Sequence, residues 1–108
     1  MASQDPALLR LTVAELGGRP LLTAEGEIDL TTTHTLAVAI SDLRAAGHRG
    51  FAIDLGAVRF IDSTGVAVLG IAVRDGIAVR VLGASEHVAR VLRVAGLAEI
   101  LDPSSSHR

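Results

Sequence analysis

At 108 residues the chain is long enough for one domain with a buried core, and its net charge of −2 argues against the basic surface of a nucleic-acid-binding protein. All 10 basic residues are arginine, which excludes lysine-dependent phosphate binding and Schiff-base chemistry, and the lack of cysteine excludes disulfides and thiolate metal sites. The 4 histidines show no metal-ligand spacing, and no apolar run approaches the ~18 residues of a membrane span. We therefore expect a cytoplasmic domain over residues 7–101, with flexible tails at 1–6 and 102–108, that needs no cofactor or metal and does not insert into membranes.

The N-terminal part of the chain predicts a β-hairpin. Leu9, Leu11 and Val13 alternate with polar residues, which is typical of a half-buried strand. A second alternating run covers residues 22–28, and the Gly-Gly step between the two runs is typical of a tight turn. We expect the two strands to pair antiparallel at one edge of a sheet.

The hydrophobic period then changes from that of a strand to that of a helix. Apolar residues at helical spacing over 36–43 predict a helix, for which Asp29 or Thr31 is the expected N-cap and Gly47 the expected stop. The short apolar run 51–55 fits a central strand, followed by a short loop.

The C-terminal half repeats this alternation. A helix is predicted from Ser63 to about residue 76, followed by a strand over 77–82. Ser85 is the expected cap of a third helix that ends at Gly96. Residues 99–101 predict a last short strand.

Strands that alternate with helices imply parallel strands joined by right-handed crossovers. We therefore predict an α/β fold with a mixed sheet, in which an antiparallel edge hairpin is followed by parallel strands and about three helices cover the sheet. Because loops that follow parallel strands emerge at the same end of a sheet, the segments 29–33, 62–65 and 83–85 are expected to meet there.

The segment Asp62-Ser63-Thr64-Gly65 is the most informative part of the chain. It places small hydroxyls where a helix begins, and free backbone N–H groups at a helix N-terminus favour an added negative charge. From spacing alone, Ser63 fits a helix N-cap as well as an acceptor for a reversible phosphate, and Asp62 fits a first-turn acid. Gly70, in the middle of this helix, predicts close packing there.

The segments 26–30 (Gly-Glu-Ile-Asp-Leu) and 58–66 (Val-Arg-Phe-Ile-Asp-Ser-Thr-Gly-Val) resemble two motifs of the STAS domain family, in the same order and at the same distance. The resemblance is strongest to single-domain bacterial anti-sigma factor antagonists and runs from about residue 8 to residue 101. It implies a STAS-like fold. The family pattern matches Ser63 to the phosphorylated hydroxyl, and Thr64, which replaces a commoner serine, is a second possible acceptor.

The resemblance also implies a function. An unphosphorylated antagonist of this family binds an anti-sigma factor that is also a serine kinase and so frees a sigma factor for transcription. Phosphorylation, matched here to Ser63, ends the association until a serine phosphatase removes the phosphate. The expected partner surface consists of residues at both junctions, namely Asp29, Thr31, Asp62, Ser63, Thr64 and Gly65.

Two alternatives belong to other classes. Asp-Ser-Thr-Gly is similar to the Asp-Ser/Thr-Gly step of aspartic proteases, but the extra hydroxyl residue breaks that spacing and those proteases are all-β, so we expect no enzymatic activity. A phospho-aspartate receiver would need a lysine, which this chain lacks. The strongest rival is a STAS domain that acts as a non-switching scaffold in a signalling or lipid-transport complex.

Overall fold

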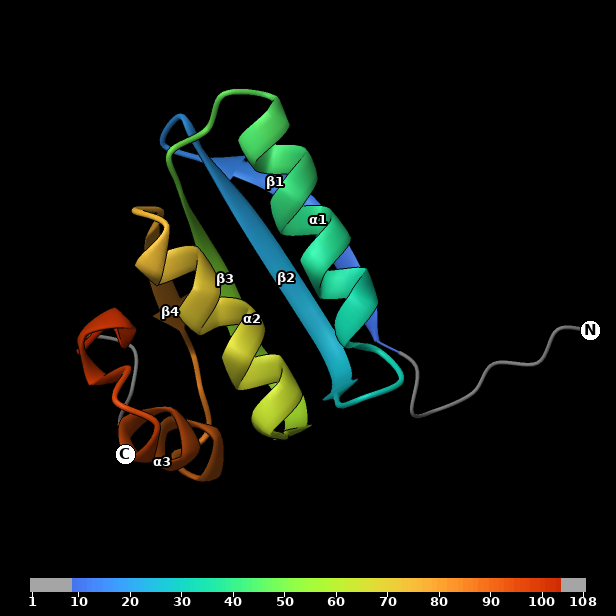
Figure 1. The fold of residues 1–108 in the computed structure, drawn as a ribbon, viewed down its shortest axis with the longest axis vertical. Helices are drawn as coiled ribbons and strands as arrows, with labels where there is room; N and C mark the ends of the chain where they lie inside the picture. Colours follow the sequence, from blue (N-terminus) through green and yellow to red (C-terminus); the bar gives the residue numbers. More distant parts are fainter. Residues whose placement is uncertain (1–8, 104–108) are drawn as a thin grey trace, which may run out of the picture.

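The computed structural model describes residues 9–103, so the tail expected at 1–6 lies outside the described residues, as does all but Asp102 and Pro103 of the tail expected at 102–108. The elements in chain order are β1 (Arg10–Leu16), β2 (Arg19–Ile28), α1 (Thr33–Ala45), β3 (Gly50–Ile61), α2 (Ser63–Arg74), β4 (Ala78–Leu82), α3 (Glu86–Val94) and the 3-10 turn η1 (Ala98–Ile100) (Figure 1). The sheet has the order β1-β2-β3-β4, with β1 antiparallel to β2 and the other pairs parallel. The predicted mixed sheet is confirmed.

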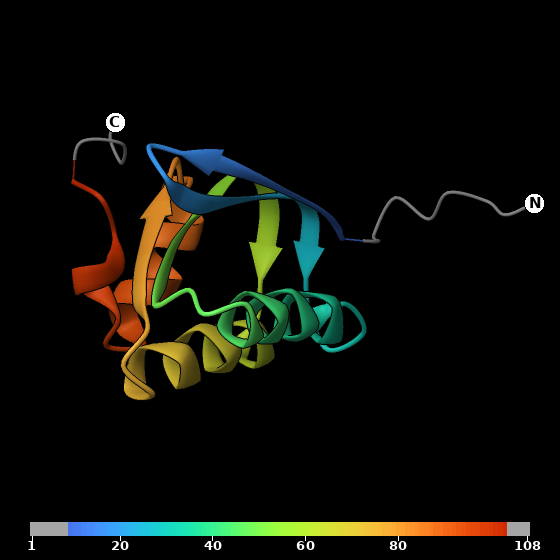
Figure 2. The same ribbon diagram turned by 90° about the horizontal axis from the view of Figure 1, so that it is seen from above.

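The core lies between the sheet and its helices. α1 and α2 run side by side over the same face of the sheet (Figure 2), and α3 lies beyond the carboxyl end of β4. Alternate residues of β2 point into this layer: Leu22, Ala24 and Ile28 are buried, whereas Thr23 and Glu25 are exposed. This alternation is the two-residue period that predicted the strand. The largest fully buried side chains are Leu22, Ile28, Leu36, Ile53, Leu55, Ile61, Leu69, Val81, Val88 and Leu92.

The hairpin forms as predicted and extends further than the alternating run. Leu16 pairs with Arg19, so only Gly17 and Gly18 form the loop. Both glycines have positive φ, at 61° and 84°. Two successive residues with positive φ match the right-handed twist of the flanking strands, and only glycine adopts this conformation without strain.

The expected loop after residue 55 is wrong, because β3 continues to Ile61. Its register against β2 shifts twice, and each shift adds one residue to β3. The buried residues in this stretch are therefore Leu55, Val58 and Ile61, three apart instead of two. At the first bulge, Oδ1 of Asp54 accepts a hydrogen bond from the backbone N–H of Gly56 at 2.8 Å.

The expected strand at 99–101 is only partly correct. Residues Ala98–Ile100 form the 3-10 turn, and Leu101 alone makes a parallel bridge to Val81 of β4. The backbone N–H of Asp102 donates to the Val81 carbonyl at 3.0 Å. The chain thus covers part of the outer edge of β4 without building a fifth strand.

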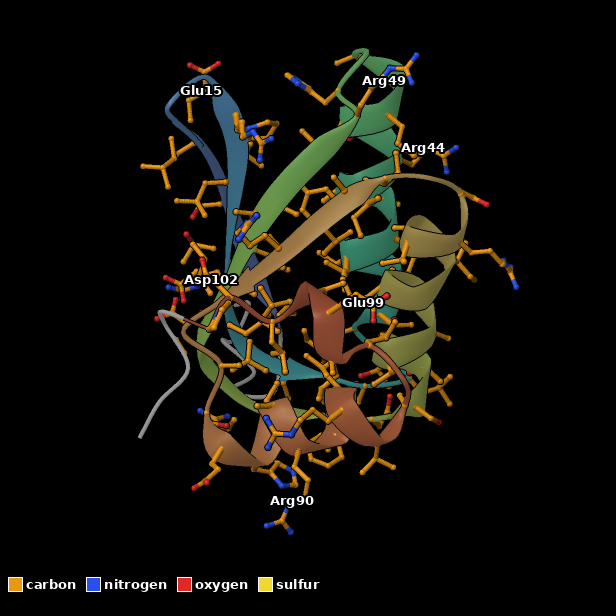
Figure 3. All side chains as sticks on the ribbon, turned by 90° about the vertical axis from the view of Figure 1, so that its left-hand side faces the viewer. Glu15, Arg44, Arg49, Arg90, Glu99 and Asp102 are labelled. Carbon is orange, nitrogen blue, oxygen red and sulfur yellow. The ribbon has the colours of Figure 1, made fainter. Side chains whose placement is uncertain are left out.

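Charged side chains lie on the outside of this framework. Figure 3 shows Glu15 at the tip of the hairpin and Arg90 projecting away from α3. Arg44 of α1 pairs with Asp75 at the end of α2, with a nitrogen–oxygen distance of 3.0 Å. Exposed ion pairs of this kind contribute at most ~1 kcal/mol each, so burial of the apolar core holds the fold together.

Candidate functional site

Two strand-to-helix junctions lie together at one edge of the sheet. Ile28 at the end of β2 pairs with Ile61 at the end of β3, and the backbone N–H of Asp62 donates to the Ile28 carbonyl at 3.0 Å. In Figure 1 the ends of both strands and the starts of α1 and α2 meet at the lower edge of the sheet. The two polar segments that follow β2 and β3 are therefore neighbours, as predicted.

The Asp62 carboxylate caps α2. Its Oδ1 accepts hydrogen bonds from the Thr64 backbone N–H at 2.9 Å, the Thr64 hydroxyl at 2.5 Å and the Gly65 backbone N–H at 3.3 Å. The expectation that Ser63 is the N-cap is wrong, since Asp62 holds that position and Ser63 is the first helical residue. A carboxylate accepts these backbone N–H groups more strongly than a neutral hydroxyl does, which favours Asp62 as the cap.

The Asp29 carboxylate forms the corresponding turn before α1. Its Oδ1 accepts hydrogen bonds from the Thr31 backbone N–H at 3.0 Å, the Thr31 hydroxyl at 2.8 Å and the Thr32 backbone N–H at 3.2 Å. The N-cap position itself belongs to Thr32, so the prediction of Asp29 or Thr31 is wrong by one residue or more.

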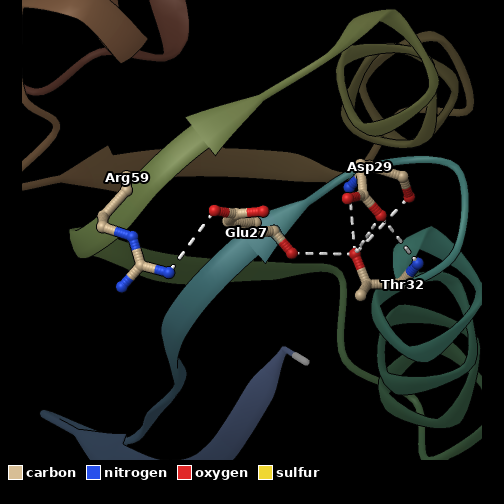
Figure 4. Close-up of polar contacts among 4 residues, drawn as sticks. All are labelled: Glu27, Asp29, Thr32 and Arg59. Atoms are coloured by element: carbon tan, nitrogen blue, oxygen red, sulfur yellow. Dashed lines mark hydrogen bonds and ion pairs between the residues drawn. The ribbon is translucent and has the colours of Figure 1, made fainter. Parts of the chain in front are cut away.

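Thr32 locks this junction to the strand. Its hydroxyl donates to the Glu27 carbonyl at 2.8 Å and accepts from the Asp29 backbone N–H at 2.9 Å, as Figure 4 shows. Thr32 is 3% exposed and is the single buried polar residue in the described part of the chain. A buried hydroxyl is tolerated because it both donates and accepts.

The two junctions share one hydrogen-bond motif, although α2 begins directly after Asp62 and α1 begins only at Thr33. In Ile28-Asp29-Leu30-Thr31 and Ile61-Asp62-Ser63-Thr64, the carboxylate accepts the N–H and the hydroxyl of the threonine two residues later. Leu30 and Ser63 are therefore equivalent positions in the two turns. Sequence reasoning missed Leu30, although the repeated Ile-Asp-x-Thr pattern was the signal that pointed to it.

Both carboxyl groups have a pKa below their ordinary value of 3.8. For Asp62 the hydrogen bond from the Thr64 hydroxyl is the largest cause, and backbone N–H groups, including that of Leu30 in the other turn, add to it. For Asp29 the Thr31 hydroxyl is the largest cause. Both pKa values are lowered despite partial desolvation, so both groups are ionised at neutral pH.

The remaining predicted residues differ in what they offer a partner. Ser63 is exposed, and its hydroxyl makes no hydrogen bond to any residue in 9–103. Thr64 is half-buried, with its hydroxyl bound to Asp62 and its carbonyl accepting from the Thr33 hydroxyl at 3.4 Å. Gly65 is buried, and a Cβ there would overlap the Ile28 side chain.

Two further expectations concern glycines. Of the segment 83–85, Gly83 does not join the two junctions as predicted, because it lies against Asp54 and Gly56 near the middle of β3. β4 ends opposite Asp54, whereas β3 continues to Ile61. The close packing expected at Gly70 is also wrong, since a Cβ there would meet no atom within 4 Å.

Neither a metal-binding cluster nor a membrane-spanning helix occurs among the described residues. Residues 9–103 contain no group of three or more His, Cys, Asp or Glu side chains placed to hold a metal ion. None of the helices in the same range has the length and apolar character to cross a membrane.

Comparison with known families agrees with this geometry. Residues 11–102 match the family model described as Mlab, STAS domain. The chain therefore belongs to the STAS domain family.

Among curated proteins, the chain is similar to the anti-sigma-F factor antagonist RsfB of Mycobacterium tuberculosis, with 39% identity over 64 residues. The match covers 59% of this chain and 52% of the relative, so the chain spans about half the length of the curated relative that it matches.

Solved structures extend the similarity to almost the whole fold. An anti-sigma factor antagonist from Mycobacterium paratuberculosis superposes with a TM-score of 0.80 at 26% identity, covering 94% of this chain and 91% of the other. The unphosphorylated form of the anti-sigma factor antagonist SpoIIAA superposes with a TM-score of 0.75 at 17% identity, covering 92% and 90%. At that identity the second likeness supports the fold alone.

Proposed function

We propose that this chain is an anti-sigma factor antagonist whose binding is ended by phosphorylation of Ser63. The carrying observation is the exposed Ser63 hydroxyl, which has no hydrogen-bond partner among residues 9–103 and stands at the first position of α2 in a STAS domain. The proposed partner surface includes Asp29, Thr31 and Asp62 beside Ser63, and Thr64 and Gly65 beneath it. Names of relatives from two mycobacteria support the same class.

The two adjacent hydroxyls differ in how accessible they are to a kinase. The Thr64 hydroxyl holds Asp62 in its capping position, so its phosphorylation would require that the turn open. The Ser63 hydroxyl is not used by the fold. Ser63 is therefore the proposed acceptor, and Thr64 a positioning residue for the turn.

A phosphate on Ser63 would change association more than stability. It adds about −1.5 to −2 charges at neutral pH. The N-terminus of α2 offsets part of that charge, by ~0.3–1 kcal/mol, while the neighbouring Asp62 carboxylate opposes it. A partner packed over Ser63 would instead bury an unpaired charge, at a cost of about 2–5 kcal/mol.

The proposed function implies two binding partners and a cellular compartment. An anti-sigma factor that is also an ATP-dependent serine kinase would bind the free form, and a serine phosphatase would restore it. Because ATP-dependent kinases and sigma factors act in the cytoplasm, we place the chain there. The chain would act by binding and would catalyse no reaction itself.

The experiment is a kinase assay followed by affinity measurement. The chain is incubated with each purified anti-sigma factor kinase of its own organism, ATP and Mg²⁺, and the phosphate is mapped by mass spectrometry. We expect modification of Ser63 and none in Ser63→Ala. Calorimetry should find Ser63→Ala binding as tightly as wild type and Ser63→Glu at least ~30-fold more weakly, corresponding to about 2 kcal/mol.

Two results would contradict the switch. Labelling of Thr64 alone would show that Thr64 and not Ser63 is the acceptor. The absence of labelling with every kinase would show that the chain has no acceptor for them. Equal affinities of wild type, Ser63→Ala and Ser63→Glu for a binding partner would favour the non-switching scaffold.

A further inference from the structure

One apolar side chain projects into solvent beside Ser63. Leu30 lies in the turn between β2 and α1 and is 73% exposed. A singly exposed leucine is common on protein surfaces and identifies nothing by itself. Its position in the site is what makes Leu30 informative.

Leu30 and Ser63 are the two x residues of the matched Ile-Asp-x-Thr turns. The turns follow strands that pair directly, and neighbouring strands lie ~4.8 Å apart. The backbone N–H of Leu30 also contributes to holding the Asp62 carboxylate ionised. Because the Leu30 backbone lies against Asp62, the residue before Ser63, we expect a protein surface that covers Ser63 to reach Leu30 as well.

The charges around Leu30 indicate the character of that surface. The Asp29 and Asp62 carboxylates are ionised and flank the two exposed positions. An apolar pocket rimmed by basic side chains or backbone N–H groups is complementary to this arrangement. An acidic or purely apolar partner surface would leave the carboxylates desolvated and unpaired.

We propose that Leu30 is the apolar anchor of the complex with the kinase, inserting into a pocket of that partner next to Ser63. This inference rests on the proposed function and adds to it a residue that determines affinity. The two turns then have different roles: Leu30 contributes binding affinity, and phosphorylation of Ser63 ends the binding.

The expected effect follows from the area that a partner would bury. Removing a leucine side chain from a filled pocket should weaken binding about 10- to 100-fold, which converts to about 1.4–2.8 kcal/mol. A few residues at the desolvated centre of an interface carry most of its binding energy, whereas residues outside it carry little.

The test uses Leu30→Ala and, as a matched control, Val94→Ala on α3, where the side chain is 82% exposed. Both full-length variants are titrated by calorimetry against the kinase that labels Ser63 most strongly. Far-UV circular dichroism and urea unfolding check that both variants remain folded. We expect Leu30→Ala to bind 10- to 100-fold more weakly and Val94→Ala to bind within twofold of wild type.

The outcomes separate this inference from the proposed function. If Ser63→Glu loses affinity but Leu30→Ala binds like wild type, the anchor is wrong and the switch stands. If Ser63→Glu binds like wild type but Leu30→Ala binds more weakly, the switch fails and the anchor stands; if neither variant loses affinity, both fail. If the chain alone dimerises at calorimetric concentrations and Leu30→Ala abolishes the dimer without changing kinase affinity, Leu30 serves self-association and the anchor is overturned.

Discussion

The Thr64 hydroxyl donates a 2.5 Å hydrogen bond to Oδ1 of Asp62. Because of this bond, the adjacent hydroxyls of Thr64 and Ser63 have different roles. Thr64 is committed to the scaffold, whereas Ser63 is exposed. Since Asp62 also caps α2 through two backbone N–H groups, the proposed acceptor Ser63 is held in position by its neighbours and not by its own side chain.

Thr64→Val keeps the shape of the side chain and removes this bond. We expect a loss of about 1–2 kcal/mol in the free energy of unfolding, because a hydrogen bond to a half-buried carboxylate is lost. The pKa of Asp62 should rise toward its ordinary value of 3.8. Urea unfolding followed by circular dichroism measures the stability. Thr64→Ser, which keeps the hydroxyl, is the control and should lose less than half as much.

Gly65→Ala should destabilise the fold by about 1–3 kcal/mol, because the new methyl group would overlap Ile28 and crowd Ile61. Gly70→Ala in the same helix is the matched control. Nothing lies within 4 Å of its Cβ position, so it should stabilise the protein by about 0.5–1 kcal/mol. Equal losses of stability at the two sites, or a stabilised Gly65→Ala, would contradict the close contact between Gly65 and Ile28.

Thr32→Val should cost about 1–3 kcal/mol, because it leaves the Glu27 carbonyl and the Asp29 backbone N–H without their buried partner. Thr33→Val removes a hydroxyl whose bond to the Thr64 carbonyl is long, at 3.4 Å, and should cost less than half as much. Thermal and urea unfolding of both variants make the comparison. If the two variants lose equal free energy of unfolding, the hydrogen bonds of Thr32 do not stabilise the junction as described.

The two turns also predict how stability depends on pH. Because the folded pKa of Asp62 is lowered below 3.8, the unfolded state binds more protons in acid. The free energy of unfolding should therefore fall as the pH drops from about 5 to below 3.8. Asp62→Asn removes this titration, so its curve should be flatter over that range. Parallel curves, or a carboxyl that titrates at its ordinary value by NMR, would contradict the hydrogen-bond geometry.

Much of the fold could be predicted from the sequence, because most elements follow simple periods. Alternation in β2 and helical spacing in α1 bury one face each, and Ser85 caps α3 as expected, accepting from the Val88 backbone N–H at 3.1 Å. The second half of β3 escaped prediction because two bulges replace a period of two by a spacing of three.

Only part of the site could be predicted from the sequence. Its hydroxyls and acids stand out as residue types, but aspartate, serine and threonine all have oxygens that cap helices, so the pattern does not decide between Asp62 and Ser63. Leu30 was not predicted as a site residue because a leucine side chain has no polar, ionisable or nucleophilic group. The matched hydrogen bonds of the two turns show that it is the counterpart of Ser63.

The middle residue of each Asp-x-Thr turn contributes no side-chain bond to its own framework. A single codon change at that place can therefore give or remove a phosphate acceptor while the rest of the domain folds as before. Descendants of one ancestral gene can in this way diverge into regulated and permanently active forms without rebuilding their interior.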